Sequence, residues 1–254
     1  MGGSLHNHKK DLRIYLWVSI FGIAFGFLEA IVVVYLRQVY YPEGFDFPLV
    51  LASPKLFRIE LIREISTILM LASIGILSGR NAIQRFAWFL FVFAIWDVFY
   101  YIGLKFFLDW PPSLLTWDIL FLIPVVWDGP VLAPVICSLT MIGFAITVVE
   151  FERRGYPVKL TILELGMMLT GALLIFITFV WDYTAILIRN DFFSGAPFTE
   201  DSIIMQEVLS FTPTVFKWYI FIVGEIFILT GVFLRIRNIF KSQGITVGAF
   251  LGYK

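Results

Sequence analysis

Six long apolar segments constrain this chain more than any other feature. Each has close to the ~20 residues that an α-helix needs to cross ~30 Å of hydrocarbon. Helices satisfy their own backbone hydrogen bonds, which makes them suited to lipid. The sequence therefore predicts an all-α, polytopic membrane helical bundle of about six transmembrane helices. The predicted spans are residues 14–36, 57–77, 86–107, 130–149, 161–188 and 215–234.

The composition agrees with this fold class. Hydrophobic residues make up 59% of the 254 residues and charged residues 15%, whereas soluble domains carry about 25% charged residues. The first apolar segment, residues 14–36, is too long for the hydrophobic region of a cleaved signal peptide. We therefore interpret it as the first transmembrane helix and expect one integral membrane domain over residues 1–254.

Two shorter segments complete the predicted architecture. The apolar run at residues 119–126 is too short to span a membrane. We expect the region around residues 111–129 to lie at the membrane interface or to re-enter the membrane. Residues 201–210 place Ile204, Met205 and Val208 on one face, which predicts a short amphipathic helix.

The distribution of basic residues predicts the orientation, because cytoplasmic loops of membrane proteins are enriched in Lys and Arg. Six basic residues fall on one side, namely Arg37, Lys55, Arg58, Lys105, Arg189 and Lys217. The other side carries Lys9, Lys10, Arg13, Arg80, Arg85, Arg153, Arg154, Lys159, Arg235, Arg237, Lys241 and Lys254. We therefore expect a multi-pass protein of the cell inner (plasma) membrane with both termini in the cytoplasm.

The scarcity of His and Cys limits the metal and haem sites that this chain can form. Cys137 is the single cysteine, and the two histidines, His6 and His8, precede the first apolar segment. Haem sites and most zinc or copper sites require several such ligands. We expect no cofactor, no metal site and no nucleic-acid partner. The expected partners are the lipid bilayer and other membrane subunits.

Seven carboxylic acids fall within the predicted spans: Glu29, Glu60, Glu64, Asp97, Glu164, Asp182 and Glu225. Ionisable groups at this depth are costly and often functional. For any single acid, the simpler interpretation is a protonated group bonded to a neighbouring helix. Glu164 belongs to the inner rim. The candidate ligand-binding or proton-binding residues are Glu29, Glu60, Arg63, Glu64, Asp97, Asp128, Asp182 and Glu225, and no catalytic residue is assigned.

The second span carries an unusual charged face. Its uninterrupted apolar run, residues 65–77, covers only ~20 Å, so the span must include Glu60, Arg63 and Glu64. Spacings of three and four residues place these side chains on one helical face. We expect Arg63 to bridge Glu60 and Glu64. The trio is either a structural clamp or an anion and proton site.

Helix depth predicts a common cavity. Glu29, Asp97 and Asp182 lie in the outer portions of their spans, at a depth similar to Glu60 and Glu64. We expect these five acids to converge on one outward-facing cavity with Glu225 at its floor. The dipeptide Trp-Asp occurs at Trp96, Trp117, Trp127 and Trp181. These pairs are either walls of that cavity or anchors at the membrane interface.

Three functions fit this pattern. The first is proton-coupled or cation-coupled transport of a small or lipophilic ligand. The second is a membrane-embedded enzyme that modifies a lipid or isoprenoid with acid residues. The third is an accessory structural subunit of a larger membrane complex, in which the acids bond to neighbouring chains. The sequence does not choose among them, so enzymatic activity stays open.

Overall fold

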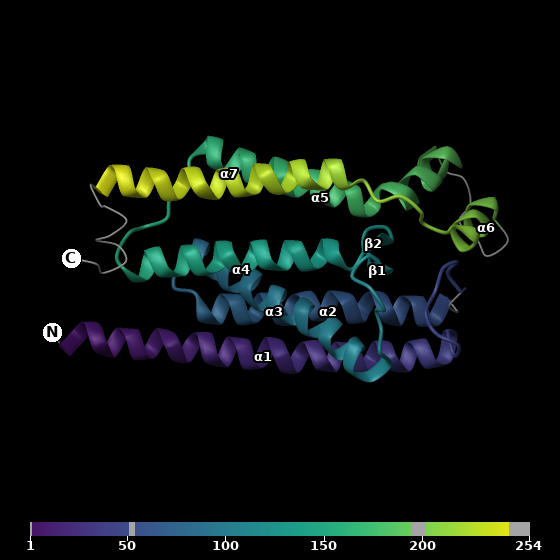
Figure 1. The fold of residues 1–254 in the computed structure, drawn as a ribbon, viewed down its shortest axis with the longest axis horizontal. Helices are drawn as coiled ribbons and strands as arrows, with labels where there is room; N and C mark the ends of the chain where they lie inside the picture. The colour runs from purple at the N-terminus through teal and green to yellow at the C-terminus, as the bar shows by residue number, and fades with distance from the viewer. Residues whose placement is uncertain (1, 51–53, 195–201, 244–254) are drawn as a thin grey trace.

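The computed structural model describes residues 2–50, 54–194 and 202–243 and is mainly helical (Figure 1). Its elements in chain order are α1 (Gly2–Tyr40), α2 (Pro54–Ser78), α3 (Ala82–Leu108), β1 (Trp117–Phe121), β2 (Trp127–Pro130), α4 (Leu132–Arg153), α5 (Ile162–Arg189), the 3-10 turn η1 (Phe192–Ser194), α6 (Ile203–Ser210) and α7 (Trp218–Gln243).

The six predicted spans are confirmed as six long apolar helices. The stretches long and apolar enough to cross a membrane are Leu12–Tyr40, Lys55–Ser78, Ala82–Leu108, Leu132–Arg153, Ile162–Arg189 and Trp218–Ser242. The chain is thus a multi-pass integral membrane protein. The short helix predicted at residues 201–210 is also present, as α6. Lys254, which the charge count used, lies outside the described residues.

Polar residues cap several helix ends, and α3 extends beyond its predicted span of residues 86–107. The Asn81 side chain accepts a hydrogen bond from the backbone N–H of Gln84 at the start of α3. Thr161 and Glu164 form a reciprocal capping box at the start of α5. At the end of α3, Asp109 adopts a left-handed conformation with φ of 51°. Such caps satisfy the unpaired backbone groups of a helix end.

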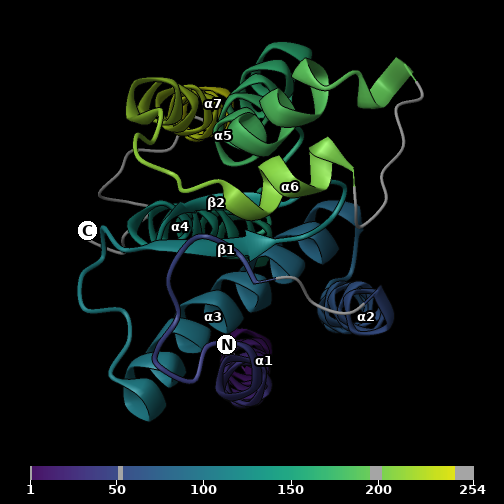
Figure 2. The ribbon, with the colours of Figure 1, turned by 90° about the vertical axis from the view of Figure 1, so that its right-hand side faces the viewer.

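The helices form two groups. α3 lies at the centre of the first group and packs against α1, α2 and α4. α5 and α7 form the second group and lie side by side along their length (Figures 1 and 2). Close backbone approach joins this pair, since a Cβ atom at Gly171 would clash with the carbonyl oxygen of Gly224. Small residues allow such approach between membrane helices.

The segment expected at the interface is a β-hairpin. β1 and β2 pair antiparallel, with Trp117 opposite Pro130 and Asp118 opposite Gly129. The register shifts between Ile119 and Phe121. In the view of Figure 2 the hairpin lies between α3 and α6, and in Figure 1 it lies beside the end of α4 while α1 and α5 continue past it. The apolar run is too short to span the membrane as a helix, and strand pairing supplies the hydrogen bonds that a lone segment would lack.

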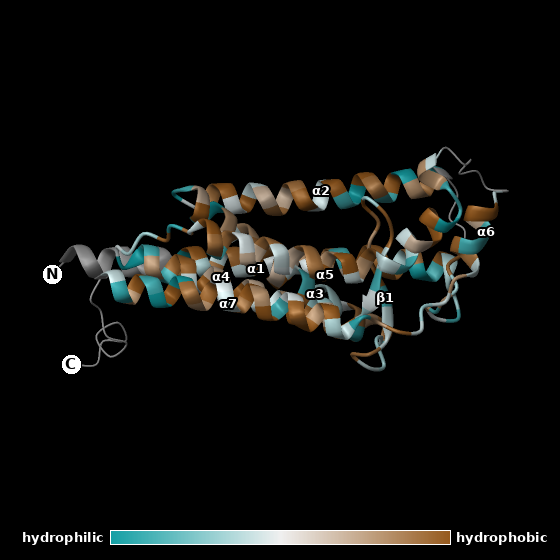
Figure 3. Cartoon of the chain, turned by 90° about the horizontal axis from the view of Figure 1, so that it is seen from above, coloured by the Kyte–Doolittle hydropathy of each residue, from teal (hydrophilic) through white to brown (hydrophobic). Residues whose placement is uncertain are grey.

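The side chains of the long helices are distributed as lipid exposure requires. On α2, Ile62 and Leu69 are more than half exposed, whereas Glu64, Thr67 and Leu71 are buried. The exposed residues of this set are apolar, and the polar Glu64 and Thr67 face the protein together with Leu71. Figure 3 shows the same pattern as hydrophobic bands along the middle of the helices, with hydrophilic residues toward their ends.

Candidate functional site

A cavity of about 730 Å³ lies at the end of the bundle where α1 ends and α2 begins. Its walls come from α1, α2, α3, the β1–β2 hairpin, α6 and the segment that follows α1. Most lining residues are apolar. Of the described residues that line it, five are acids and three are arginines, namely Glu29, Glu60, Glu64, Asp97, Asp118, Arg37, Arg58 and Arg63.

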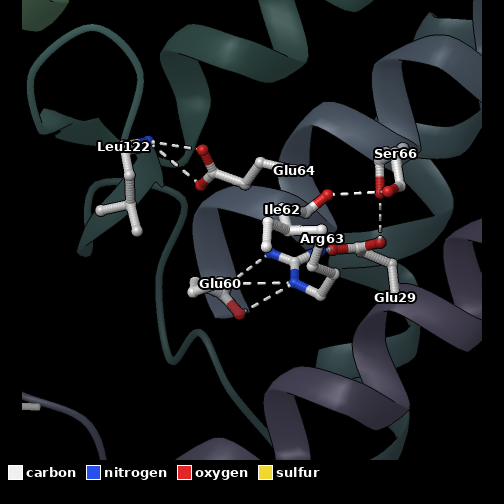
Figure 4. A network of polar contacts seen from close by, with 8 residues as sticks. Glu29, Glu60, Ile62, Arg63, Glu64, Ser66 and Leu122 are labelled. Atoms are coloured by element: carbon white, nitrogen blue, oxygen red, sulfur yellow. Dashed lines mark hydrogen bonds and ion pairs between the residues drawn. The ribbon is translucent and has the colours of Figure 1, made fainter. Parts of the chain in front are cut away.

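An ionic triad links α1 to α2 at this cavity (Figure 4). The Arg63 Nε atom donates to both carboxylate oxygens of Glu60 at 3.0 Å. The Arg63 guanidinium also forms an ion pair with Glu29 of α1. Thr67 donates its hydroxyl to Glu29 at 3.3 Å. The triad therefore holds two helices together and carries one more acid than base.

This arrangement corrects the expectation that Arg63 bridges Glu60 and Glu64. Glu64 instead accepts the backbone N–H of Leu122, at 3.1 Å to each of its two oxygens. Leu122 directly follows β1, so this N–H has no partner in the hairpin ladder. An unpaired N–H is costly away from water. Glu64 accepts the Leu122 N–H, and Glu29 is the second acid that pairs with Arg63.

A second ionic pair lies where the hairpin meets α1. The Arg37 Nη2 atom donates to Asp118 Oδ1 at 3.0 Å, and both side chains are buried. The Arg37 guanidinium lies 3.8 Å from the ring centre of Trp110 and 4.5 Å from that of Phe45. Such contacts fix its position. Burial raises the pKa of Asp118 to about 6, although the Arg37 charge lowers it.

α3 contributes Asp97, the last of the five acids that line the cavity among the described residues. Asp97 accepts the hydroxyl of Ser138 in α4 at 2.8 Å. One turn further along α3, Tyr100 stacks on Trp96 with ring centres 6.3 Å apart. Tyr100 is within electrostatic range of Asp97 and Asp118. Asp97 and the hairpin acid therefore belong to one polar region of the cavity.

The charged groups lie deep along their helices. Glu29 is eleven residues before the end of α1, and Asp97 is eleven residues before the end of α3. Arg63 is nine residues after the start of α2. At 1.5 Å per residue these positions are ~14–16 Å from the helix ends. The charged groups therefore lie more than two helical turns inside the helix ends, within the apolar stretches of α1, α2 and α3.

Two candidate acids lie elsewhere, in the second helix group. Asp182 of α5 forms an ion pair with Lys217 at 3.3 Å. Asp128 of β2 is buried, and its Oδ2 atom has no hydrogen-bond partner among the described residues. Burial raises the pKa of Asp128 to about 8, and the negative charge of Asp182 contributes to this rise. Neither acid lines the cavity, so the four Trp-Asp pairs separate into two places.

Glu225 also lies apart from the cavity. It is buried between α7 and α4 and accepts the hydroxyl of Thr140 at 2.8 Å. It is not among the residues that line the cavity, contrary to the expectation that it forms the floor. Depth alone was the basis of that expectation. α7 packs mainly on α5, which places Glu225 on the far side of α4.

Sequence reasoning did not include Arg37, Asp118, Trp96 and Tyr100 among the candidates, although all four line the cavity. A signal existed for three of them. Trp96 and Asp118 belong to two of the four Trp-Asp pairs, and Arg37 follows Glu29 by eight residues on roughly the same helical face. The contact between them joins residues 81 positions apart. That separation made it invisible in the sequence.

Comparison with known protein families, with curated proteins and with solved structures found no match for this chain.

Proposed function

We propose that this integral membrane protein binds a lipophilic ligand with a polar head group in a cavity that faces out of the cell. One observation carries the proposal: apolar walls surround a group of charged side chains that lie inside the ends of the membrane-spanning helices. The volume of about 730 Å³ lies within the ~300–1,000 Å³ of ordinary ligand pockets. Apolar walls suit a hydrocarbon chain, and the charged groups suit a head group.

The gathering of acids supports binding over a purely structural role. Glu29, Glu60, Glu64 and Asp97 come from three helices and line the same cavity. Acids that served only as contacts to other subunits would have no need to share an interior space. The accessory-subunit hypothesis is therefore less favoured. Transport and catalysis both begin with binding, and binding is the step that the geometry supports.

The packing of α2 supports entry from the lipid side. α1 and α2 both line the cavity, and each packs along α3, but they touch one another only sparsely. Phe57 of α2 and Val50 before it line the cavity and are 41% and 48% exposed. We infer that a ligand enters between α1 and α2 from the outer leaflet. The outward direction rests on the excess of basic residues at the other end.

The test is to identify what the purified protein carries. The chain is extracted in mild detergent, and bound small molecules are analysed by mass spectrometry against the bulk lipid extract. A Val33→Trp variant places a bulky ring on the cavity wall, and Leu69→Trp places the same ring on the lipid-facing side of α2. Gel filtration of both variants checks that they remain folded.

We expect a lipophilic molecule enriched in the wild type and in Leu69→Trp but depleted in Val33→Trp. If nothing is enriched over bulk lipid, or if Val33→Trp retains the same molecule, the cavity is not the binding site. Reconstituted vesicles then distinguish the two hypotheses that build on binding. Transport would deplete the identified ligand from one leaflet, and catalysis would convert it to a product of different mass.

A further inference from the structure

Three residues that line the cavity each have a buried polar atom that lacks a hydrogen-bond partner among the described residues. The atoms are Arg37 Nη1, Trp96 Nε1 and Asp118 Oδ2. The three residues are 7%, 7% and 1% exposed, respectively. Most buried polar atoms in folded proteins are paired. Unpaired atoms on residues that line a cavity therefore indicate the groups that a ligand can bring after small side-chain shifts.

A ligand would need both a hydrogen-bond donor and an acceptor to pair with these atoms. Asp118, which has the Tyr101 hydroxyl close by, can accept a further donor at Oδ2. The N–H groups of Arg37 and Trp96, by contrast, need an acceptor oxygen. Arg37 and Asp118 are already joined through Nη2 and Oδ1 at 3.0 Å, so their unpaired atoms belong to neighbouring groups. A head group that carries a donor and an acceptor a few bonds apart would match them.

The charges of the cavity favour a cationic donor. Five acids line it against three arginines among the described residues. Asp97 is in electrostatic range of Asp118, and its recorded hydrogen-bond donor is the neutral Ser138 hydroxyl. A primary ammonium offers three N–H donors to such carboxylates, whereas a quaternary ammonium offers none. Hydrogen bonds between charged groups are also the stronger kind.

We propose that the ligand's head group carries a primary ammonium and a neighbouring anionic oxygen, as in a lipid with an ethanolamine phosphate head group. The ammonium binds Asp97 and Asp118. The anionic oxygen accepts from Arg37 and Trp96. The acyl chain lies against the apolar walls and leaves the cavity between α1 and α2. This inference rests on the proposed function, because it names the class of ligand for the same cavity.

Three single-chain probes test the head group while the chain is held constant: 1-palmitoyl lysophosphatidylethanolamine, lysophosphatidylcholine and lysophosphatidylglycerol. All three carry a phosphate, and only the first carries N–H donors on a cation. Dissociation constants are measured by native mass spectrometry of the full chain in mild detergent. We expect the ethanolamine probe to bind at least about tenfold tighter than the other two, the effect of one charge-assisted hydrogen bond.

Variants assign the two parts of the head group. Asp118→Asn should remove the preference for the ethanolamine probe, and Asp97→Asn should reduce it. Arg37→Met should weaken all three probes alike, because each contains the phosphate. Asp182→Asn is the matched control, since Asp182 is paired with Lys217 outside the cavity, and it should keep the full preference. The ratio of the dissociation constants of the probes is compared within each variant. Partial misfolding lowers the binding of all probes alike and leaves this ratio unchanged.

The outcomes separate this inference from the proposed function. If all three probes bind equally and Val33→Trp abolishes binding, the cavity holds lipophilic ligands but the head-group inference is wrong. If the choline probe binds as tightly as the ethanolamine probe, the hydrogen-bonding role of the acids is wrong. If no probe binds, or if Val33→Trp binds them all unchanged, both proposals fail.

Discussion

Loss of Arg63 should destabilise the protein far more than loss of an exposed arginine. The Arg63 side chain is 23% exposed, and its partners Glu29 and Glu60 are 7% and 19% exposed. Breaking a buried ion pair costs ~3–5 kcal/mol, because the remaining charge is left uncompensated. Partial exposure places Arg63→Ala near the lower limit, at about 3 kcal/mol. For a protein of this size that is a fall in Tm of ~6–12 °C.

Arg189→Ala is the matched control. Arg189 is also paired with a glutamate, Glu207, but its side chain is 66% exposed. Exposed pairs contribute under about 1 kcal/mol, so the Tm should fall by less than ~4 °C. Both variants are measured by thermal unfolding in the same mild detergent. Equal shifts for Arg63→Ala and Arg189→Ala would refute the claim that the triad is buried.

A neutral triad provides the complementary measurement. The triple variant Arg63→Met, Glu29→Gln and Glu60→Gln removes both acids together with the base. Replacing all partners of a buried pair is often nearly neutral, because no charge remains unpaired. The triple variant should therefore recover most of the stability lost in Arg63→Ala. A triple variant less stable than Arg63→Ala would show that the charges themselves stabilise the fold.

Three further outcomes are expected. Gly171→Ala should destabilise the α5–α7 pair through its clash with Gly224, whereas Gly166→Ala, which meets nothing within 4 Å, should be neutral or stabilising by up to ~1 kcal/mol in thermal unfolding. Asp128 has a folded pKa of about 8 against 3.8, so it retains a proton that the unfolded chain loses between these values. Stability should therefore fall as pH rises across this window, and Asp128→Asn should flatten that dependence. Topology reporters fused after Arg154 and Lys241 should report cytoplasm, and those fused near Glu43 and Asp191 the opposite side; a cytoplasmic signal near Asp191 would contradict the orientation.

The sequence predicted the features that depend on the length of an apolar run and on the position of a residue along its helix. The apolar runs gave all six long helices, since hydrocarbon thickness fixes the number of residues required. Counting residues from the helix ends also placed Glu29, Arg63 and Asp97 at similar depth, and they line one cavity. Depth does not fix the direction in which a helix faces. Asp182 has a similar depth but belongs to α5, which pairs with α7 away from the cavity.

The sequence could not predict contacts that tertiary structure creates. The run at residues 119–126 gave no periodicity that distinguishes a strand from a short helix. Its partner strand includes Trp127 and Asp128, which were interpreted as a Trp-Asp pair with a candidate acid and not as part of a strand. The same hairpin brings Leu122 to Glu64 and Asp118 to Arg37. Once the hairpin is missed, both contacts are missed, and the expected partner of Arg63 changes with them.

The measurement that tests the central claim most directly is the reactivity of a cysteine placed in the cavity. In a Cys137→Ser background, Val33→Cys lies on the cavity wall and Leu69→Cys lies on the lipid-facing side of α2. Intact cells are treated with membrane-impermeant thiosulfonate reagents that are either cationic or anionic. We expect Val33→Cys to react from outside, and faster with the cationic reagent, because acids outnumber arginines in the cavity. Leu69→Cys should stay unreactive. A Val33→Cys variant that is as unreactive as Leu69→Cys, or that reacts only from the cytoplasmic side, would contradict an outward-facing acidic cavity.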